Sequence, residues 1–278
     1  MKYYIVDAFT DKPFGGNPAG VVLLGDNAFP DERLMMQIAA ELRYSETAFV
    51  QRHSDNEYTI RYFTPMAEVE LCGHATIAAF AMMHKIGIAN GDCICHTKAG
   101  DFSIESGKRV MMQMATPHII KTITDFAPLY HALGLDNYKP KLPVQVAYSG
   151  LSDIMLPIPD TVTLNTLQTN MNAIAALTER YNAVSFHLFA FANDNYTAHV
   201  RDFAPQYGIP EESATGTANA ALTYYLKTNG VINQPCDCLF LQGEAMGRPS
   251  TVATRITADE TIYVGGTAAI VAQGEILI

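Results

Sequence analysis

Two stretches of small and apolar residues dominate the hydrophobic pattern of this chain, and each begins at a glycine. The first runs from Gly73 to Gly87, and the second from Gly216 to about Asn229. In the first, alanine, isoleucine and methionine recur at helical spacing. Gly87 suits the left-handed conformation in which many helices end. The pattern predicts one helix from Gly73 and a second from Gly216.

The second stretch repeats the first. A shift of 143 residues gives eight identities in 28 ungapped positions, where unrelated sequences would share about two. The aligned pairs are Gly73/Gly216, Ala75/Ala218, Ala78/Ala221, Gly87/Gly230, Asn90/Asn233, Cys93/Cys236, Cys95/Cys238 and Gly100/Gly243. We infer two structurally equivalent halves. Each half carries one helix N-terminus, whose free N–H groups and positive dipole end can hold a carboxylate or phosphate.

Short strands and three further helices account for the remaining pattern. Helical spacing predicts helices at 31–42, 126–133 and 172–180. Alternating or apolar runs predict strands at 2–8, 21–24, 44–50, 58–63, 93–97, 101–105, 110–114, 144–147, 153–158, 184–191, 196–203, 237–242, 251–257, 261–264 and 268–272. A polar stretch of little periodicity begins at 116–117. We therefore place an N-terminal lobe at 1–116, joined by the final strand 267–278, and a C-terminal lobe at 117–266.

The composition is that of a globular protein. Apolar residues make up 49% and charged residues 17% of the 278 positions, which is sufficient for a large core. The net charge of −10 argues against a nucleic-acid surface. The sequence lacks a signal-peptide core and any apolar run of the roughly 20 residues that a membrane span needs. With only five cysteines, we expect reduced thiols and a cytoplasmic location.

Glu46 is the first candidate for chemistry. It stands between a predicted helix and an apolar, β-prone run, where partial burial would raise the pKa of its carboxyl. Such a group can act as a general acid or base near neutral pH. The alternative, which the local sequence alone favours, is a surface glutamate at a strand start.

Three more polar residues lie near the predicted helix starts. His74 is either a site residue or a buried histidine that a backbone carbonyl satisfies. Glu211 and Glu212 precede Gly216, where negative charge is favourable in any protein. Glu212 stays a candidate because it lies beside the small-residue entry to the predicted anion site.

The cysteines fall into two groups. Cys72 precedes the first helix, where the pKa of a thiol can fall, and the repeat places Thr215 opposite it. Two Cys-x-Cys pairs, 93/95 and 236/238, lie at matching points of the two halves, and their four thiolates could meet around zinc. Structural zinc sites favour Cys-x-x-Cys, however, so we predict core packing and no metal.

Together these residues resemble the PhzF-like (phenazine biosynthesis-like) isomerases, relatives of diaminopimelate epimerase. The resemblance covers essentially the whole chain and reverses the local preference at Glu46. Its motifs are Val6-Asp7-Ala8-Phe9-Thr10, Gly16-Asn17-Pro18-Ala19-Gly20, Ser45-Glu46-Thr47-Ala48-Phe49, Cys72-Gly73-His74-Ala75-Thr76, 208–218 and Gly265-Gly266.

The resemblance implies a fold and a reaction. The fold is α/β (α+β), with two pseudo-symmetric lobes, each a curved mixed sheet wrapped around a central helix, and an active site in the cleft between them. Family members are homodimers that need no metal or organic cofactor. In the phenazine enzyme, the glutamate that matches Glu46 moves a proton between two carbons of a dihydro-hydroxyanthranilate.

The same resemblance implies the remaining site residues. His74 and Glu212 match residues that line the site, as catalytic partners of Glu46. Backbone amides at Gly73, His74, Gly216 and Thr217 match those that grip the substrate, and we place Cys72 and Thr215 beside them. The implied function is a cofactor-independent isomerase of a small carboxylated metabolite.

Two departures from the relatives bear on the substrate. The phenazine enzyme has aspartate and serine where this chain has Glu212 and Thr217, so a longer acid and an added methyl narrow the pocket. Diaminopimelate epimerase uses two cysteines, whereas Thr215 cannot take a proton, which argues against a two-thiol racemase. The alternatives are an epimerase or racemase that pairs Cys72 or Glu46 with another base, and a metabolite-binding protein on the same scaffold.

Overall fold

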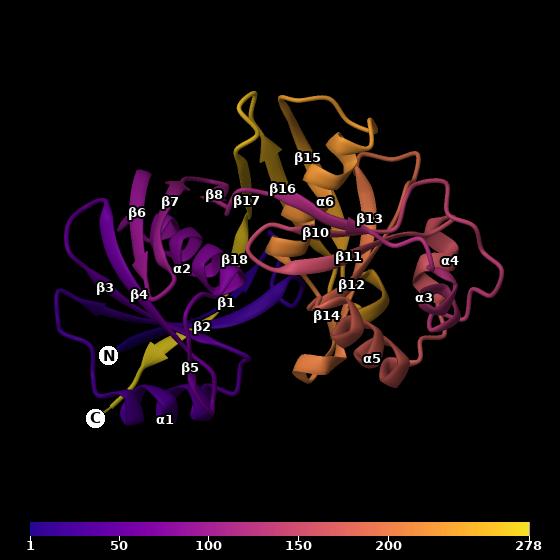
Figure 1. Ribbon diagram of the computed structural model, residues 1–278. Helices are drawn as coiled ribbons and strands as arrows, with labels where there is room; N and C mark the ends of the chain where they lie inside the picture. The colour runs from indigo at the N-terminus through magenta and orange to yellow at the C-terminus, as the bar shows by residue number, and fades with distance from the viewer. Residues whose placement is uncertain (278) are drawn as a thin grey trace. The chain divides into compact units, whose positions relative to one another are not determined.

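The computed structural model describes residues 1–277 and divides into two compact units (Figure 1). Unit 1 comprises Met1–Gln113 and the chain from Gly265 onward, and unit 2 comprises Met114–Val264. Each unit is a mixed α/β structure whose strands curve around one helix, as the sequence analysis predicted. No helix among residues 1–277 combines the length and the apolar character that crossing a bilayer requires.

Unit 1 contains two helices and the strands of the first half of the repeat. Its elements are β1 (Lys2–Ala8), β2 (Asn17–Gly25), α1 (Glu32–Leu42), β3 (Thr47–Arg52), β4 (Glu57–Phe63), β5 (Glu68–Val69), α2 (Gly73–Lys85), β6 (Gly91–Thr97), β7 (Gly100–Ser106), β8 (Val110–Gln113) and, from the end of the chain, β18 (Ala268–Glu275).

Unit 2 contains the same series with additional short helices. Its elements are β9 (His118–Thr122), α3 (Ala127–His131), β10 (Gln145–Tyr148), β11 (Ser152–Pro157), α4 (Thr161–Thr166), α5 (Met171–Tyr181), β12 (Ser185–Ala190), β13 (Ala198–Ala204), η1 (Pro205–Tyr207), β14 (Ile209–Glu212), α6 (Gly216–Thr228), β15 (Cys236–Gln242), η2 (Glu244–Met246), β16 (Ser250–Ile256) and β17 (Ile262–Gly266), whose last two residues belong to unit 1.

The two units pair their strands in the same way. In unit 1, β1–β2 is antiparallel, β2–β3 parallel, β3–β4 antiparallel, β4–β6 parallel and β6–β7 antiparallel. In unit 2, the corresponding pairs β10–β11, β11–β12, β12–β13, β13–β15 and β15–β16 follow the same sequence of directions. The internal repeat read from the sequence is therefore a repeat of topology.

The central helices show why the repeat is visible in the sequence. Both α2 and α6 have 13 residues, and their first residues differ by 216 − 73 = 143. Ten residues of α2 and eight of α6 are buried, so neither helix has an exposed polar face. A helix enclosed by a curved sheet needs small apolar residues on every side, and alanine supplies them in both units.

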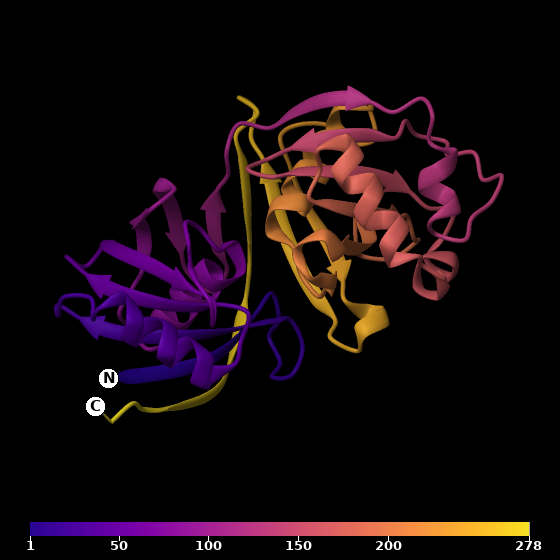
Figure 2. The ribbon, with the colours of Figure 1, turned by 60° about the horizontal axis from the view of Figure 1, so that its bottom comes forward.

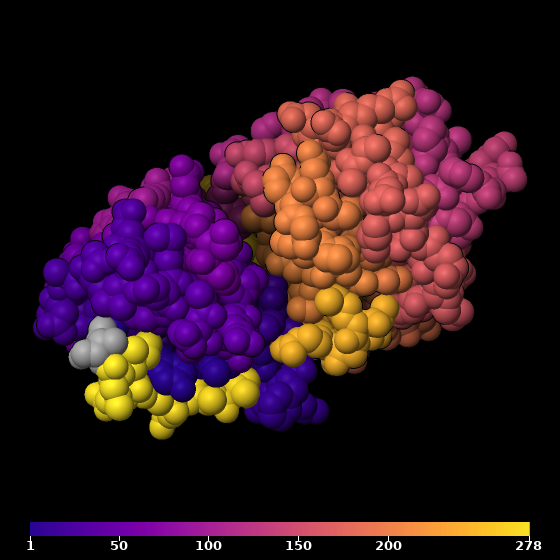
Figure 3. Space-filling view, turned by 90° about the horizontal axis from the view of Figure 1, so that it is seen from below, coloured from indigo at the N-terminus to yellow at the C-terminus, as the bar shows by residue number. Residues whose placement is uncertain are grey.

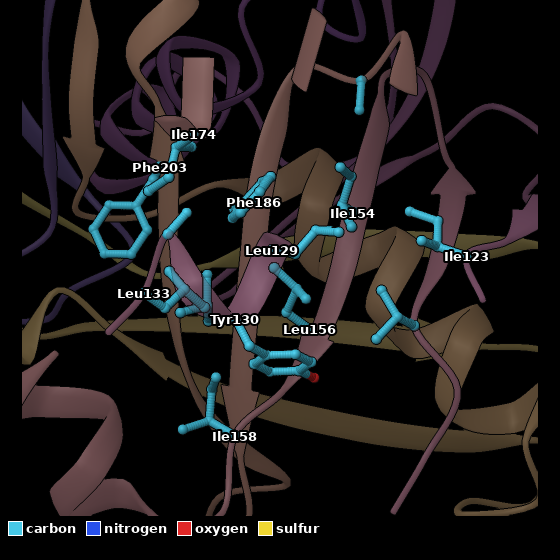
Figure 4. Close-up of a cluster of buried hydrophobic side chains, with 14 of the residues drawn as sticks. Ile123, Leu129, Tyr130, Leu133, Ile154, Leu156, Ile158, Ile174, Phe186 and Phe203 are labelled. Carbon is cyan, nitrogen blue, oxygen red and sulfur yellow. The ribbon is translucent and has the colours of Figure 1, made fainter. Parts of the chain in front are cut away.

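Each unit has its own hydrophobic core. In unit 2, helices α3, α4 and α5 pack their apolar side chains against β11, β12 and β13. Figure 4 shows Leu129 and Tyr130 of α3 beside Leu156 and Phe186 of the strands. The Tyr130 hydroxyl donates a hydrogen bond of 2.9 Å to the Pro157 carbonyl, so this buried polar group is satisfied.

The last strand of the chain completes unit 1. Strand β18 pairs antiparallel with β1, and the Met1 ammonium donates a 2.8 Å hydrogen bond to the Ile276 carbonyl. Figure 2 shows both chain ends at this edge, and Figure 3 shows the terminal strand on its surface. In unit 2, β9 pairs antiparallel with β10 and occupies the equivalent place. The two units are completed in the same way. Strand β18 follows β17 of unit 2 and pairs with β1 of unit 1, and β9 follows β8 of unit 1 and pairs with β10 of unit 2.

The structure corrects the sequence-based elements at several places. No regular structure was predicted for the segments that form strands β5, β9 and β14, helix α4 and the short helices η1 and η2. The Cys-x-Cys pairs are also not equivalent, because β6 and β15 differ by 236 − 91 = 145 residues. The loop that precedes β15 is two residues longer than the loop before β6, so Cys93 corresponds to Cys238.

Candidate active site

Unit 1 brings Glu46, Cys72 and His74 together. His74 Nε2 lies 3.4 Å from Glu46 Oε2, and His74 Nδ1 lies 3.4 Å from Cys72 Sγ. One ligand-type atom from each residue lies within 4.8 Å of the other two. Three residues that the sequence analysis selected separately thus form one cluster at the start of α2.

The backbone of β2 holds Glu46 in place. Glu46 immediately precedes β3, and its carbonyl accepts a 3.1 Å hydrogen bond from the Gly20 N–H. A Cβ atom at Gly20 would lie 2.7 Å from Thr47 Oγ1 and 3.0 Å from Leu42 Cδ1, closer than side chains tolerate. Glycine at this position therefore allows β2 to approach β3 closely enough to fix Glu46.

His74 is buried and favours its neutral form. Its side chain is 8% exposed, and this burial lowers the pKa of the imidazole, although the nearby Glu46 carboxylate and a hydrogen bond to the Pro18 carbonyl partly oppose the shift. A neutral imidazole has one donor and one acceptor nitrogen. His74 can therefore donate to a carbonyl or orient a carboxyl group without carrying charge.

One carboxylate oxygen of Glu46 has unused hydrogen-bonding capacity. Glu46 Oε2 is buried and has no hydrogen-bond partner among residues 1–277. The side chain as a whole is 19% exposed, so solvent and small molecules reach part of it. A buried acceptor without a donor is costly in a folded protein, and such atoms are commonly found where a ligand completes the bonding.

The first turn of α2 is anchored from inside the unit. The Thr76 hydroxyl lies 2.7 Å from the Cys72 carbonyl and 2.6 Å from the Tyr62 hydroxyl. The Cys72 side chain caps none of the N–H groups of the first turn. A Cβ atom added at Gly73 would meet no heavy atom within 4 Å beyond its chain neighbours and its own helix. The space beside this helix start is therefore open, and the N–H groups of a helix N-terminus can bind an anion.

The equivalent turn of unit 2 carries a carboxyl and hydroxyl cluster. The Thr215 hydroxyl lies 2.7 Å from Glu212 Oε2 and 3.1 Å from Asp202 Oδ2. Gln242 fixes this arrangement, because its amide nitrogen donates to Thr215 Oγ1 and to the Glu212 carbonyl, and its oxygen accepts from the Thr215 N–H. Gly216 and Thr217 form the first two residues of α6 directly after this cluster.

The cluster of Glu46, Cys72 and His74 is also the one group of three or more potential metal ligands within residues 1–277. A thiolate, an imidazole and a carboxylate suit Zn²⁺. The strand cysteines have a different environment, since burial raises the pKa of the Cys95 thiol to about 12. A thiol with so high a pKa remains protonated and is a poor ligand.

Several residues that position the site were not selected from the sequence. The segment Gly16–Gly20 was selected only as a family motif, without a role in the site, yet Pro18 contacts His74 and Gly20 contacts Glu46. In unit 2, Asp202 and Gln242 contact Thr215. The sequence signal that could have identified Asp202 and Gln242 is a polar residue within an otherwise apolar strand. Such a residue is buried with the rest of the strand, as in β13, which is buried along its whole length.

Comparison with known proteins places this geometry in context. The model of the family described as phenazine biosynthesis-like protein matches residues 6–274. An uncharacterized isomerase, YddE, from Escherichia coli K12 is 35% identical over 291 residues, covering 99% of this chain and 97% of the relative. The trans-2,3-dihydro-3-hydroxyanthranilate isomerase of Pseudomonas chlororaphis is 29% identical over 261 residues, covering 91% of this chain and 89% of the enzyme.

A solved structure agrees with the sequence matches. The crystal structure of a PhzF-family phenazine biosynthesis protein from Bacillus anthracis has a TM-score of 0.88 to this chain. The two proteins are 27% identical, and the alignment covers 100% of this chain and 99% of the other. The fold is therefore shared from end to end.

Proposed function

Because this chain belongs to the phenazine biosynthesis-like protein family, whose relatives include named isomerases, we propose that it isomerises a small carboxylated metabolite by moving a proton between carbons, without a cofactor. One observation carries the proposal. Glu46 Oε2 is buried, has no hydrogen-bond partner among the described residues and lies beside a neutral imidazole at a helix start.

Glu46 supplies the proton transfer in this proposal. Ionised Glu46 removes a proton from a carbon next to an activating group, and the electron pair left behind delocalises into that group. Protonated Glu46 then returns the proton to another carbon of the conjugated system as the electron pair shifts. The carboxyl ends as it began, so the reaction needs no external oxidant or reductant.

Two further features stabilise the charge in this mechanism. The first-turn N–H groups of α2, at Gly73 and His74, bind the substrate carboxylate or the charge that develops during the reaction. The one N–H of neutral His74 is used by the Pro18 carbonyl, so its other nitrogen can accept a hydrogen bond from a protonated carboxyl such as Glu46. We propose Glu212, at the equivalent turn of unit 2, as a second titrating carboxyl.

An epimerase is the second candidate. Cys72 Sγ lies 3.4 Å from His74 Nδ1, and an imidazole next to a thiol can activate it as a base. Thr215 occupies the equivalent N-cap position of α6, and its hydroxyl cannot serve as the opposing base at neutral pH. An epimerase would therefore pair Cys72 with a carboxyl, and alkylation of Cys72 would abolish its activity.

Deuterium incorporation detected by NMR tests the proposal. Wild type, Glu46→Gln and the exposed control Glu41→Gln are incubated in heavy water with a panel of small carboxylic acids that includes trans-2,3-dihydro-3-hydroxyanthranilate. We expect carbon-bound deuterium with wild type and Glu41→Gln and a loss of at least a hundredfold with Glu46→Gln. Exchange that persists in Glu46→Gln and disappears on thiol alkylation would transfer the role to Cys72.

A metabolite-binding protein on the same scaffold predicts a different result. A ligand would then raise the melting temperature of wild type and Glu46→Gln alike, and neither protein would incorporate deuterium into that ligand. Thermal shift measurements with the same panel separate this outcome from a panel that contains no ligand at all.

A further inference from the structure

A chain of hydrogen-bonded carboxyl and hydroxyl groups extends from Glu212 into unit 2. Beyond Thr215, Asp202 Oδ1 lies 2.7 Å from the Ser185 hydroxyl, which in turn lies 2.9 Å from Asp153 Oδ1. The three carboxyls come from β11, β13 and β14, and the hydroxyls between them come from β12 and the start of α6. Asp153 and Asp202 are each only 2% exposed.

The number of hydrogens fixes the protonation of this chain. It contains four oxygen–oxygen contacts of 2.7 to 3.1 Å, and each requires one bridging hydrogen. Ser185 and Thr215 supply one each, because a hydroxyl has a single hydrogen. The remaining two hydrogens must reside on carboxyl groups. The three carboxyls thus hold two protons and one negative charge.

The surroundings of the chain agree with this count. Burial and the neighbouring Asp202 and Glu212 charges raise the pKa of Asp153 well above its usual range, although the Ser185 hydroxyl partly opposes the shift. Asp153 therefore holds one of the two protons. The second proton belongs to the pair Asp202 and Glu212, which face each other across the Thr215 hydroxyl.

The groups around Asp202 are donors that favour a negative charge shared with Glu212. His187 Nδ1 lies 2.9 Å from Asp202 Oδ1, and its ring is fully buried. Gln242 donates to the Thr215 hydroxyl from the opposite side. The nearest arginine along β13, Arg201, forms its ion pair with Glu211 at 2.8 Å. Among residues 1–277, the hydrogen bonds to Asp202 and Asp153 come from hydroxyl and imidazole groups and the Ser185 backbone, and not from arginine or lysine.

We propose that Asp202 is a positioning residue that shares one proton with Glu212 across the Thr215 hydroxyl, so that Glu212 enters the reaction as a proton donor. The step balances within the chain: Asp202 passes a proton to Thr215 Oγ1 as Thr215 passes its own hydrogen to Glu212 Oε2. When two carboxyls share a site, a proton between them belongs to the pair and not to either residue alone. The role in catalysis rests on the proposed isomerase function, whereas the shared proton does not.

Infrared spectroscopy of the free protein tests the shared proton without any substrate. The carbonyl stretch of a neutral carboxyl is separate from that of a carboxylate, so difference spectra at neutral pH count protonated acids. We expect Glu212→Gln and Asp202→Asn each to remove the same neutral-carboxyl band. Glu211→Gln, an acid of the same strand outside the chain, leaves that band in place. Because Asp202→Asn could destabilise unit 2, the partly exposed Glu212→Gln and the near-isosteric Thr215→Val serve as second variants.

The possible outcomes decide the proposal. Spectra in which Glu212→Gln and Thr215→Val leave the neutral-carboxyl bands unchanged would overturn the shared proton, whether or not a substrate is known. With a substrate in hand, Asp202→Asn should move the basic limb of the pH–rate profile to lower pH by about one unit or more, while Glu211→Gln does not move it. If Asp202→Asn removes the neutral-carboxyl band but leaves the basic limb of the pH–rate profile in place, Asp202 takes no part in the reaction and its positioning role is refuted.

Discussion

Replacement of Thr76 by valine tests whether the start of α2 depends on one buried hydroxyl pair. Thr76 and Tyr62 are both fully buried, and their hydroxyls lie 2.6 Å apart. Valine keeps the shape of threonine but removes the partner of the Tyr62 hydroxyl, which retains only the weakly hydrogen-bonding Cys95 thiol. We expect a loss of about 1–3 kcal/mol, which is the cost of an unsatisfied buried hydroxyl.

A double-mutant cycle isolates this interaction from other effects. Tyr62→Phe should cost less than Thr76→Val, about 0.5–1.5 kcal/mol, because the Thr76 hydroxyl still donates to the Cys72 carbonyl. The double variant removes both hydroxyls and should therefore cost at least about 1 kcal/mol less than the sum. Urea denaturation followed by circular dichroism measures all four proteins. Additivity within about 0.3 kcal/mol would refute the coupling and the anchoring role of Thr76.

Three further predictions address the site and its surroundings. Gly20→Ala should destabilise unit 1 by several kcal/mol and reduce exchange activity, because the added Cβ collides with β3; unchanged melting would contradict this close approach. Burial lowers the pKa of His199, but the hydrogen bonds that its imidazole donates to Asp194 and Glu244 outweigh this effect, and the net shift of the pKa is upward. The stabilisation that this shift provides is complete below the unfolded pKa of about 6.5 and is lost as the pH rises through the folded pKa. The free energy of unfolding should therefore fall less steeply between pH 6 and 8 in His199→Gln than in wild type. Micromolar Zn²⁺ should inhibit proton exchange reversibly, with relief by a chelator and weaker inhibition in Cys72→Ser; equal inhibition of both proteins would exclude the thiol as a ligand.

The fold was predictable from the sequence where the structure is locally determined. The sequence analysis placed the first residues of α2 and α6 correctly. Each helix is enclosed by a sheet, and this enclosure explains the glycine at its start and the alanine on every face. Strand β9 was missed because most of its residues are exposed and show no alternation. Strand β14 was missed because Gly208 before it and Pro210 within it indicate a loop, whereas its pairing with β13 makes it a strand.

The candidate site was predictable only in part, for a reason of distance along the chain. Cys72 and His74 are neighbours in sequence, and the family motif added Glu46. The contacts that position them come from Pro18 and Gly20, which reach the cluster through the parallel pairing of β2 with β3. Similarly, Asp202 meets Thr215 only because the register of β12, β13 and β14 brings them together. A single sequence does not encode such registers in any local pattern.

The place of β18 in unit 1 has a consequence for synthesis on the ribosome. Unit 2 is continuous in sequence, so all of its residues have been synthesised once the chain has passed Val264. Strand β1 of unit 1 is made first, yet its partner β18 is made last. At about 5–20 residues per second, β1 waits many seconds with one edge unpaired, and an unpaired edge invites aggregation. We therefore expect the pairing of β18 with β1 to be a late step in the folding of unit 1, and nascent chains stalled before β18 to be the form that depends most on chaperones.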